Sequence, residues 1–273
     1  MTTQRILLML LLAGIAATAR AADRKPLELG VIPYLPTEKL IAAYQPLRNH
    51  LEEKLRRKVV LSTAPDFTKF LERSLRREYD LIVIGSGLGR QAELEAGYNP
   101  LVATRRNIKA LIVVRHESPY AGPKDLAGKR VATIDPMTGL TQLGQDIFRR
   151  AGMLSGRDYV LVTVKSPSNA IHTLLHDDAE AAVTSALQYP QVEENIRSRL
   201  RVIAESREIP GLLFMLRPGS VIGANSLRDT LLAFARSDAG KQFIDELAID
   251  GLRVPTSKEL KALDDILPEL RKR

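Results

Sequence analysis

Short polar side chains gather where three predicted strands end and the following helices begin. In the second half of the chain these candidates are Thr138, Gly139, Thr141, Ser168, Asn169 and Ser185. In an α/β sheet such positions meet at one edge, where ligands bind. Unpaired backbone N–H groups and the helix dipole make a helix start favourable for an anion. The pattern therefore predicts a site that holds a small oxyanion through neutral hydrogen-bond donors, with Gly139 letting the backbone approach closely.

Two further candidates come from the first half of the chain. Tyr34 follows the strand predicted over 27–32, where its hydroxyl can close over a ligand. Ser86 lies in Gly85-Ser86-Gly87, after the apolar strand 81–84, and offers another donor. A simpler alternative stays open for every candidate. Helix starts use hydroxyl and amide side chains as caps, tight turns use glycine and serine, and a tyrosine after a strand often only packs.

The chain lacks the residue sets that most enzymes use for nucleophilic or metal-assisted chemistry. It has no cysteine and no Gly-x-Ser-x-Gly motif, and its four histidines are scattered. His172 and His176 have a spacing that suits a metal, but no HExxH glutamate accompanies them, and a partly exposed helix end explains them as well. Arg105, Arg106 and Lys109 lie near the expected connection between the two halves and could contribute to a site, but a solvated role is favoured. We predict no catalytic residue, no metal and no cofactor.

Short apolar runs alternate with amphipathic helical patterns, which is typical of an α/β protein with parallel strands. The predicted strands cover 27–32, 59–63, 81–84, 101–104, 108–114, 130–134, 159–164, 181–184, 201–204 and 211–216. The predicted helices cover 37–55, 66–76, 88–96, 125–129, 169–176, 189–199, 227–237, 240–249 and 257–266, and the segment 135–143 is a loop running into a helix. Thr37 is expected to cap the first helix. Only helices are expected after the last strand.

The N-terminus has the features of an export signal. Arg5 precedes an uncharged run over 6–17, and Ala19-Arg20-Ala21 offers small residues for cleavage before Ala22. A membrane anchor is the alternative, but the run is shorter than the roughly 20 residues that a spanning helix needs. The formal charge of +8 falls to +6 without Arg5 and Arg20. Export argues against nucleic acid as a partner, and the absence of cysteine leaves core burial to stabilise the exported chain.

Several segments resemble the phosphate-, phosphite- and phosphonate-binding periplasmic proteins. They occur in the order and spacing of that family and cover nearly the whole mature chain. The segments are Leu27-Glu28-Leu29-Gly30-Val31-Ile32-Pro33-Tyr34, Gln45-Pro46-Leu47 with Leu51-Glu52, Tyr79-Asp80-Leu81-Ile82-Val83-Ile84-Gly85, Asp125-Leu126-Ala127-Gly128-Lys129-Arg130-Val131-Ala132 and Ala204-Glu205-Ser206-Arg207-Glu208-Ile209-Pro210.

The resemblance implies a two-lobe type II periplasmic binding protein, with a ligand clamped between two α/β lobes. It implies that, after the signal peptide predicted over 1–21, residues 22–111 and 216–273 form lobe 1 and residues 112–215 form lobe 2. Hinge strands are expected near 108–114 and 211–216. Hydroxyls and backbone N–H groups of the segment around Thr138, Gly139 and Thr141 would hold the oxyanion. The chain has no cysteine for lipid attachment, so an exported form would stay near the cytoplasmic membrane only within a second barrier. We therefore expect a Gram-negative periplasm as its location, and we expect a monomer.

This chain departs from the family pattern at two candidates. Asn169 stands where the family commonly has a histidine, and Ser185 stands where phosphonate binders tend to carry a carboxylate that meets an amino group. The second difference argues against an aminoalkyl phosphonate. The implied partner is a membrane ABC permease, and the alternative is a membrane receptor kinase to which the loaded protein presents its ligand.

Overall fold

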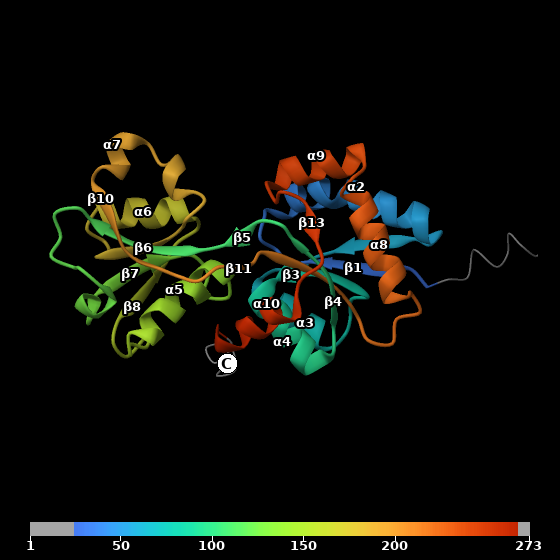
Figure 1. The fold of residues 1–273 in the computed structure, drawn as a ribbon, viewed down its shortest axis with the longest axis horizontal. Coiled ribbons are helices and arrows are strands. Elements are labelled where there is room, and N and C mark those ends of the chain that lie inside the picture. Colours follow the sequence, from blue (N-terminus) through green and yellow to red (C-terminus); the bar gives the residue numbers. More distant parts are fainter. Residues whose placement is uncertain (1–24, 267–273) are drawn as a thin grey trace, which may run out of the picture.

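The computed structural model describes residues 25–266, so the predicted signal peptide lies outside the described residues. Within this range the chain forms two α/β lobes joined by a narrow connection (Figure 1). Lobe 1 is the part built on a six-stranded sheet, and lobe 2 is the part built on a five-stranded sheet. The described helices include none that is both long and apolar enough to cross a membrane. The predicted fold class is therefore confirmed.

The lobe 1 sheet has the strand order β13-β4-β12-β3-β1-β2. Its strands are β1 (Leu27–Val31), β2 (Val59–Ser62), β3 (Leu81–Gly85), β4 (Asn99–Thr104), β12 (Leu212–Leu216) and β13 (Leu252–Arg253). Strands β1, β2 and β3 are parallel, whereas β12 runs antiparallel to both β3 and β4. The helices of this lobe are α2 (Thr37–Leu55), α3 (Phe67–Leu75), α4 (Ser86–Ala96), α8 (Ala224–Phe234), α9 (Asp238–Leu247) and α10 (Ser257–Lys261), followed by the 3₁₀ turn η3 (Ala262–Ile266).

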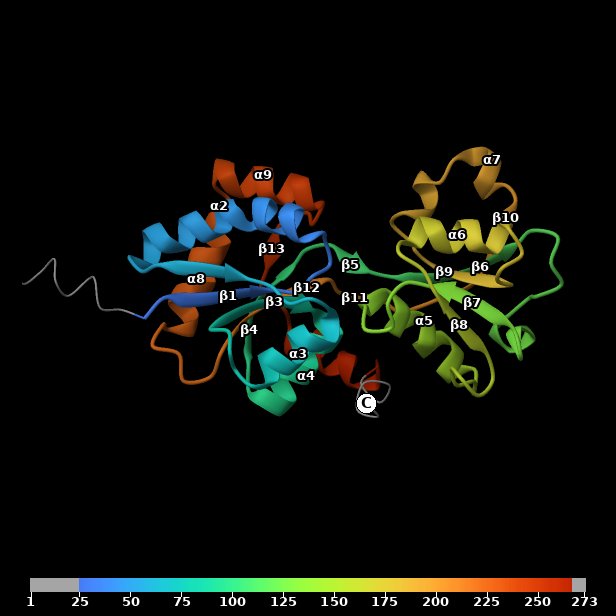
Figure 2. The same ribbon diagram turned by 180° about the vertical axis from the view of Figure 1, so that it is seen from behind.

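Both faces of this sheet are covered, which explains why its strands are apolar on both sides. On one face Leu27 and Leu29 pack with Tyr44 and Leu47 of α2 and with Phe243 of α9. On the other face the sheet packs against α3 and α4 (Figure 2). The strand β3 is therefore buried over Leu81–Ile84, and its carboxyl end emerges at the gap between the lobes.

The lobe 2 sheet has the strand order β10-β6-β9-β7-β8. Its strands are β6 (Ala110–Arg115), β7 (Arg130–Thr133), β8 (Val160–Thr163), β9 (Ala181–Ser185) and β10 (Leu200–Glu205). Its helical segments are η1 (Pro123–Leu126), α5 (Gly139–Arg150), α6 (Pro167–Leu175), η2 (Tyr189–Gln191) and α7 (Glu194–Arg197). Because β7, β8 and β9 are parallel, the segments that follow them leave the same edge of the sheet.

The connection between the lobes is shorter than the hinge strands that we predicted. A two-stranded ribbon joins β5 (Asn107–Ile108) to β11 (Ile209–Pro210), with Ile108 opposite Ile209. Most of the predicted hinge belongs to the sheets themselves, since β6 is a strand of lobe 2 and β12 is a strand of lobe 1. The border expected at 111/112 and 215/216 cuts through both strands. We propose moving the border to this ribbon, because a strand packed inside a sheet cannot bend freely.

Several local predictions were wrong for identifiable reasons. The strand β13 lies after β12, where only helices were expected, and its two residues are too few to show a pattern. Thr37 is the first residue of α2 and not its cap, since Pro36 holds that position without a side-chain hydrogen bond. The helix expected over 189–199 is divided into η2 and α7. Helix α4 begins at Ser86, so the expected tight turn is the first turn of a helix.

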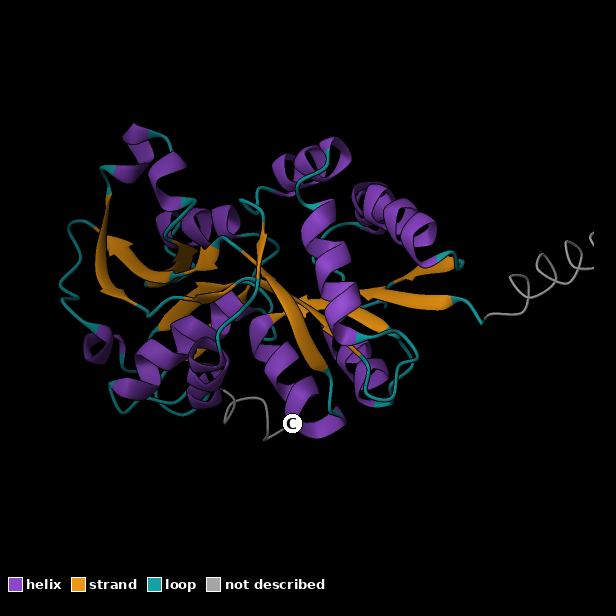
Figure 3. Cartoon of the chain, turned by 45° about the vertical axis from the view of Figure 1, so that its right-hand side comes forward, coloured by secondary structure: helices purple, strands orange, loops and turns teal. Residues whose placement is uncertain are grey.

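The C-terminal part of the described chain returns to the connection between the lobes. The segment formed by α10 and η3 packs against α4 of lobe 1 and α5 of lobe 2 (Figure 3). Gln142 of α5 also lies directly against Gly87 of α4, so closely that a Cβ at position 87 would collide with its side chain. The two lobes therefore touch on this side of the molecule, and the space for a ligand lies elsewhere.

Candidate functional site

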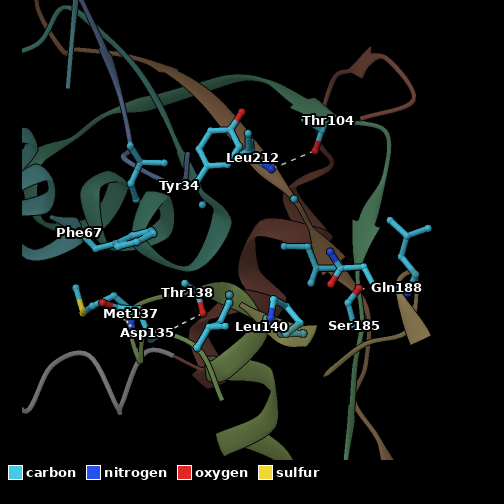
Figure 4. Close-up of a pocket in the computed structure, with 18 of the residues that line it drawn as sticks. Tyr34, Phe67, Thr104, Asp135, Met137, Thr138, Leu140, Ser185, Gln188 and Leu212 are labelled. Atoms are coloured by element: carbon cyan, nitrogen blue, oxygen red, sulfur yellow. Dashed lines mark hydrogen bonds between the residues drawn. The ribbon is translucent and has the colours of Figure 1, made fainter. Parts of the chain in front are cut away.

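A cavity of about 700 Å³ lies between the lobes and beside the connecting ribbon (Figure 4). Lobe 1 contributes segments around β1, the start of α3, the end of β3 and the loop after α9. Lobe 2 contributes the segments that follow β7, β8 and β9. Four of the eight predicted site residues line this cavity: Tyr34, Thr138, Gly139 and Ser185. The cavity therefore occupies the expected edge of the lobe 2 sheet, but it does not include every candidate.

The start of α5 provides the backbone donors of the site. The Thr138 hydroxyl caps this helix, because it accepts a hydrogen bond from the Thr141 N–H at 3.4 Å and donates one to the Asp135 carbonyl at 2.8 Å. The N–H groups of Gly139 and Leu140 have no hydrogen-bond acceptor within the described chain, and both residues line the cavity. These two N–H groups, at the positive end of a twelve-residue helix, form a place for an anion.

Close packing sets the position of α5. Gly144 lies against β9, and a Cβ at this position would meet both methyl groups of Val183 at 2.9 Å. Asp135 shapes the loop before the helix, since its Oδ1 accepts a hydrogen bond from the Met137 N–H at 2.7 Å. The loop and helix are thus fixed by the protein itself, so the two free N–H groups are held ready for a ligand.

Thr141 contributes to the interior of lobe 2 and does not line the cavity. Its side chain is fully buried, and its hydroxyl lies 2.8 Å from that of Thr133. It also donates to the Ile134 carbonyl at 3.1 Å. Since neighbouring groups already bind this hydroxyl, the prediction that Thr141 contacts the ligand does not match its place in this structure. Its function here is to support the loop that ends at Thr138.

Ser168 and Asn169 lie on the exposed first turn of α6 and do not line the cavity. The actual cap is Ser166, whose hydroxyl accepts from the Asn169 N–H at 3.1 Å and donates to the Asn169 side-chain oxygen at 2.9 Å. Asn169 is therefore the partner of the cap in the first turn of the helix, which is closer to the simpler alternative than to a ligand contact. Lys165 and Pro167 from the same segment line the cavity instead. Ser185 lines it too, and its Oγ accepts from the Leu187 N–H at 3.2 Å.

In lobe 1 the hydroxyl groups of Tyr34 and Ser86 are turned into the protein. The Tyr34 hydroxyl lies 3.1 Å from that of Tyr44, so only its ring faces the cavity. Burial raises the pKa of Tyr34 to about 12 and raises that of Tyr44 as well. Ser86 is 1 % exposed, and it donates to the Pro210 carbonyl at 2.6 Å. Ser86 thus ties α4 to the connecting ribbon and does not reach the cavity.

Other cavity residues were not among the predicted site. Arg106 lines the wall beside the ribbon, where it is paired with Asp250. Lys165 and Gln188 come from loops of lobe 2, whose places could not be inferred from spacing alone. A large apolar surface of the cavity was not predicted either, because the sequence pattern of its residues is that of buried core residues. These residues are Ile32, Phe67, Leu88, Ile108, Ile134, Met137, Leu140, Leu187, Leu212, Leu247 and Ile249.

The histidine pair with metal-like spacing does not form a metal site in the described part of the chain. His172 lies in the last turn of α6, and His176 is the residue that ends it. Both are exposed. Between residues 25 and 266, no group of three or more histidine or acidic side chains is close enough to hold a metal ion.

Similar solved structures confirm the fold. A protein of Xanthomonas citri solved with ATP has a TM-score of 0.78 and 18% identity, over 91% of this chain and 99% of that one. PhnD1 of Prochlorococcus marinus, solved with methylphosphonate, has a TM-score of 0.72 and 16% identity, over 91% and 99%. A binding component of a phosphonate ABC transporter from Pseudomonas aeruginosa has a TM-score of 0.67 and 16% identity, over 92% and 98%.

The family is shown by the sequence match and not by these distant structures. Residues 29–260 match the model of the periplasmic substrate-binding proteins of phosphonate ABC transporters. Members of this family are binding components of transporters and not enzymes, and they act in the periplasm. The resemblance noted from the sequence is therefore confirmed. The chain belongs to the family of periplasmic substrate-binding proteins of phosphonate ABC transporters.

Proposed function

We propose that this protein captures a phosphonate-like oxyanion in the cavity between its lobes and delivers it to an ABC permease. The observation that carries the proposal is the pair of free N–H groups at the start of α5, which belong to the cavity-lining residues Gly139 and Leu140. The acid group of the ligand accepts from both, in the manner of anions bound at helix starts. Methylphosphonate bound to the similar protein from Prochlorococcus marinus supports this choice of ligand class.

Among the predicted site residues, Gly139 and Ser185 remain in the proposed site as donors, and Thr138 remains as the cap that fixes the helix start. The Ser185 oxygen accepts a backbone hydrogen bond, so its proton is available to a ligand oxygen. Tyr34 contributes its ring. Thr141, Ser168, Asn169 and Ser86 support neighbouring elements in this structure and are left out of the proposed contacts.

The ligand is trapped by movement of the lobes about the ribbon of β5 and β11. Only short segments join the lobes there, which allows a hinge motion with small changes in backbone angles. Binding of one anion to groups of both lobes would favour the closed form. The closed, loaded protein then docks as a monomer on the permease. Presentation to a receptor kinase uses the same cavity and differs only in the docking partner.

Export follows from the N-terminal sequence. The segment 1–21 acts as a signal peptide and is removed between Ala21 and Ala22. The N-terminal mass of protein recovered from a periplasmic extract checks this directly. A chain that retains Met1 and stays with the membrane would instead support an anchor.

The function is tested by calorimetric titration of the mature protein with methylphosphonate, phosphite, phosphate, sulfate and acetate. We expect saturable one-to-one binding of at least one phosphorus oxyanion, together with a rise in melting temperature, because the ligand binds only the folded state. Small-angle scattering should show a more compact particle with ligand. Absence of binding by every phosphorus oxyanion would refute the proposal.

A further inference from the structure

The polar side chains of the cavity are distributed unequally between its two walls. On the side of lobe 1 and the ribbon, each polar side chain is already bound by the protein. The Thr104 hydroxyl accepts from the Leu212 N–H at 3.1 Å, and the Tyr34 hydroxyl pairs with Tyr44. Arg106 forms a two-point pair with Asp250, with Nε 2.7 Å from one carboxylate oxygen.

The same holds for Asn107, the remaining polar side chain of this wall. Its amide nitrogen donates to Glu208 at 3.2 Å, and its amide oxygen accepts from Arg253 at 3.2 Å. Apart from Nη1 of Arg106, which the pair with Asp250 leaves unbound, the side-chain surface that this wall offers to a ligand is therefore apolar. Phe67, Leu88, Ile108 and Leu212 form its largest part.

The wall of lobe 2 carries the polar side chains that are not yet bound. Within residues 25–266, no hydrogen bond or ion pair engages the side chains of Lys165, Thr163 or Gln188. Lys165 is the cavity cation without an acidic partner in this range, since Arg106 is paired. These groups share the wall with the free N–H groups of α5. Figure 4 shows Tyr34 and Thr104 on one side of the space and Thr138, Leu140 and Ser185 on the opposite side.

The size of the cavity also exceeds what a bare acid group fills. A volume of about 700 Å³ is that of roughly twenty water molecules in the liquid. Methylphosphonate would leave most of this volume to water. Displacing that water from the apolar wall lowers the free energy, so a larger apolar ligand is favoured. A ligand with an acid group and an apolar substituent can form hydrogen bonds with the wall of lobe 2 and apolar contacts with the wall of lobe 1.

We propose that the preferred ligand is a phosphonate whose substituent is apolar and larger than a methyl group, an alkyl- or arylphosphonate. This inference rests on the function proposed above. Lys165 and the start of α5 hold the acid head on lobe 2, while Phe67, Leu88, Ile108 and Leu212 hold the substituent on lobe 1. The ligand thus bridges the lobes by its two chemically different ends, and the length of the substituent determines how well it stabilises closure.

An amino group on the substituent is the main competing chemistry. Asp135 is the acidic residue that lines the described cavity, and one of its oxygens is occupied by the Met137 N–H. It lies on the wall of lobe 2, with the acid-binding groups. An ammonium group that extends toward lobe 1 would meet Phe67 and Leu212, where no free acceptor side chain is present among the described residues. The proposed site therefore disfavours an aminoalkyl phosphonate.

The test compares affinities of the wild-type mature protein for matched phosphonates. Affinity should rise about fourfold with each added methylene from methyl- to butylphosphonate. Propylphosphonate should bind more tightly than 2-aminoethylphosphonate, which has the same number of non-hydrogen atoms. Equal or weaker binding of the longer alkyl compounds, or a preference for the amine, would overturn this inference and leave the proposed function intact. Absence of binding by every phosphonate would overturn both.

Two variants then test which wall binds the acid group and which binds the substituent. Lys165→Gln should lower the affinity for methylphosphonate and for butylphosphonate by the same factor, about tenfold. Lys124→Gln, outside the cavity, should change neither affinity. Phe67→Ala should lower the affinity for butylphosphonate about fivefold and the affinity for methylphosphonate only slightly. Leu94→Ala, on the exposed side of α4, is the control. If Phe67→Ala weakens both ligands equally, the assignment of the apolar wall is wrong. The wild-type series decides the inference even if a variant fails to fold.

Discussion

The guanidinium of Arg207 donates a hydrogen bond to the carboxylate of Asp265, with 2.7 Å between Nη1 and Oδ2. Arg207 lies in the second connection between the lobes, and Asp265 lies in η3. The other terminal nitrogen of Arg207 forms an ion pair with Asp146 of α5 at 3.4 Å. One side chain therefore links the connection to the C-terminal segment and to the helix that presents the anion site. The same guanidinium lowers the pKa of Asp265.

We expect the two acidic partners of Arg207 to contribute unequally to stability. Asp146 is 2 % exposed and also pairs with Arg149 and Arg150, so Asp146→Asn removes a buried charge that three guanidinium groups share. This change should lower the free energy of unfolding by about 2–3 kcal/mol, measured by urea titration. Asp265→Asn is the matched control, because Asp265 is 61 % exposed and its pair is screened by water. Equal losses in the two variants would contradict this difference in burial.

Most of the fold could be predicted because long apolar runs determine buried strands. The residues Leu81–Ile84 are apolar without a break, and a strand covered on both faces is the simplest structure for them. The buried face of α2 follows from its spacing equally well, since Leu40, Tyr44, Leu47 and Leu51 recur every three or four residues and are all buried. The two residues of β13 carry no such pattern. They form a strand only because β4 supplies the partner.

The site was predicted less completely because a residue type does not say which way its side chain points. Asn169 and Thr138 both lie at helix starts, yet only Thr138 reaches the cavity. Phe67 follows the same apolar spacing as the buried Phe70 and Leu71, but it is the first residue of α3 and lines the space between the lobes. Which face of a helix meets the other lobe depends on how the lobes are joined, and that joining depends on contacts between distant segments.

The ring of Tyr34, and not its hydroxyl, should matter for the ligand. Tyr34→Phe should leave the affinity for methylphosphonate within about twofold, and it should lower the free energy of unfolding by about 1–2 kcal/mol because the Tyr44 hydroxyl loses its partner. A spectroscopic titration should find that Tyr34 ionises only near pH 12, as its raised pKa requires. A tenfold loss of affinity without loss of stability would show instead that the hydroxyl turns to the ligand.

Gly144 should be needed for the position of α5. Gly144→Ala places a methyl group against both methyls of Val183, whose contact distance of 2.9 Å forces the helix away from β9. The cost of overpacking, about 1–3 kcal/mol, is only partly offset by the better helix propensity of alanine. We expect a lower melting temperature and weaker binding of methylphosphonate. An unchanged melting temperature would indicate that Val183 moves aside without cost.

Glu259 should make stability depend on pH in the acid range. Its carboxylate accepts hydrogen bonds from Arg253, with 2.6 Å between Oε1 and Nη2, and from the Thr256 N–H at 2.8 Å. The hydrogen bonds from Arg253 come first among the causes that lower its pKa from 4.5 to about 2. A lowered pKa stabilises the folded state above pH 4.5, and this contribution is lost as the pH falls from 4.5 toward 2.

Glu259→Gln measures this contribution, because glutamine can retain the capping hydrogen bonds but not the charge. The variant should be less stable than the wild type by about 1 kcal/mol at pH 7, a value reduced by the remaining exposure of the pair. The difference should disappear near pH 2. Glu38→Gln, at an exposed carboxylate of α2, is the control for the loss of one negative charge. A constant difference in stability from pH 7 to pH 2 would show that the charge of Glu259 is not its source.

Gly139→Pro tests the backbone donors of the anion site without disturbing the helix. Gly139 is the first residue of α5, where proline is well accepted because the N–H has no partner in the helix. Thr138 already has φ −75° and ψ 146°, the extended conformation that a residue before proline prefers. A Cβ at position 139 would lie 3.5 Å from Ile108, an ordinary contact.

The variant therefore removes one N–H and leaves the fold in place. Methylphosphonate affinity should fall about tenfold or more, since a hydrogen bond to a charged group contributes about 1.5–3 kcal/mol. Gly139→Ala retains the N–H while adding a similar contact, so its affinity should stay close to that of the wild type. If calorimetry finds the same loss in both variants, the added bulk is responsible, and the ligand does not use this donor.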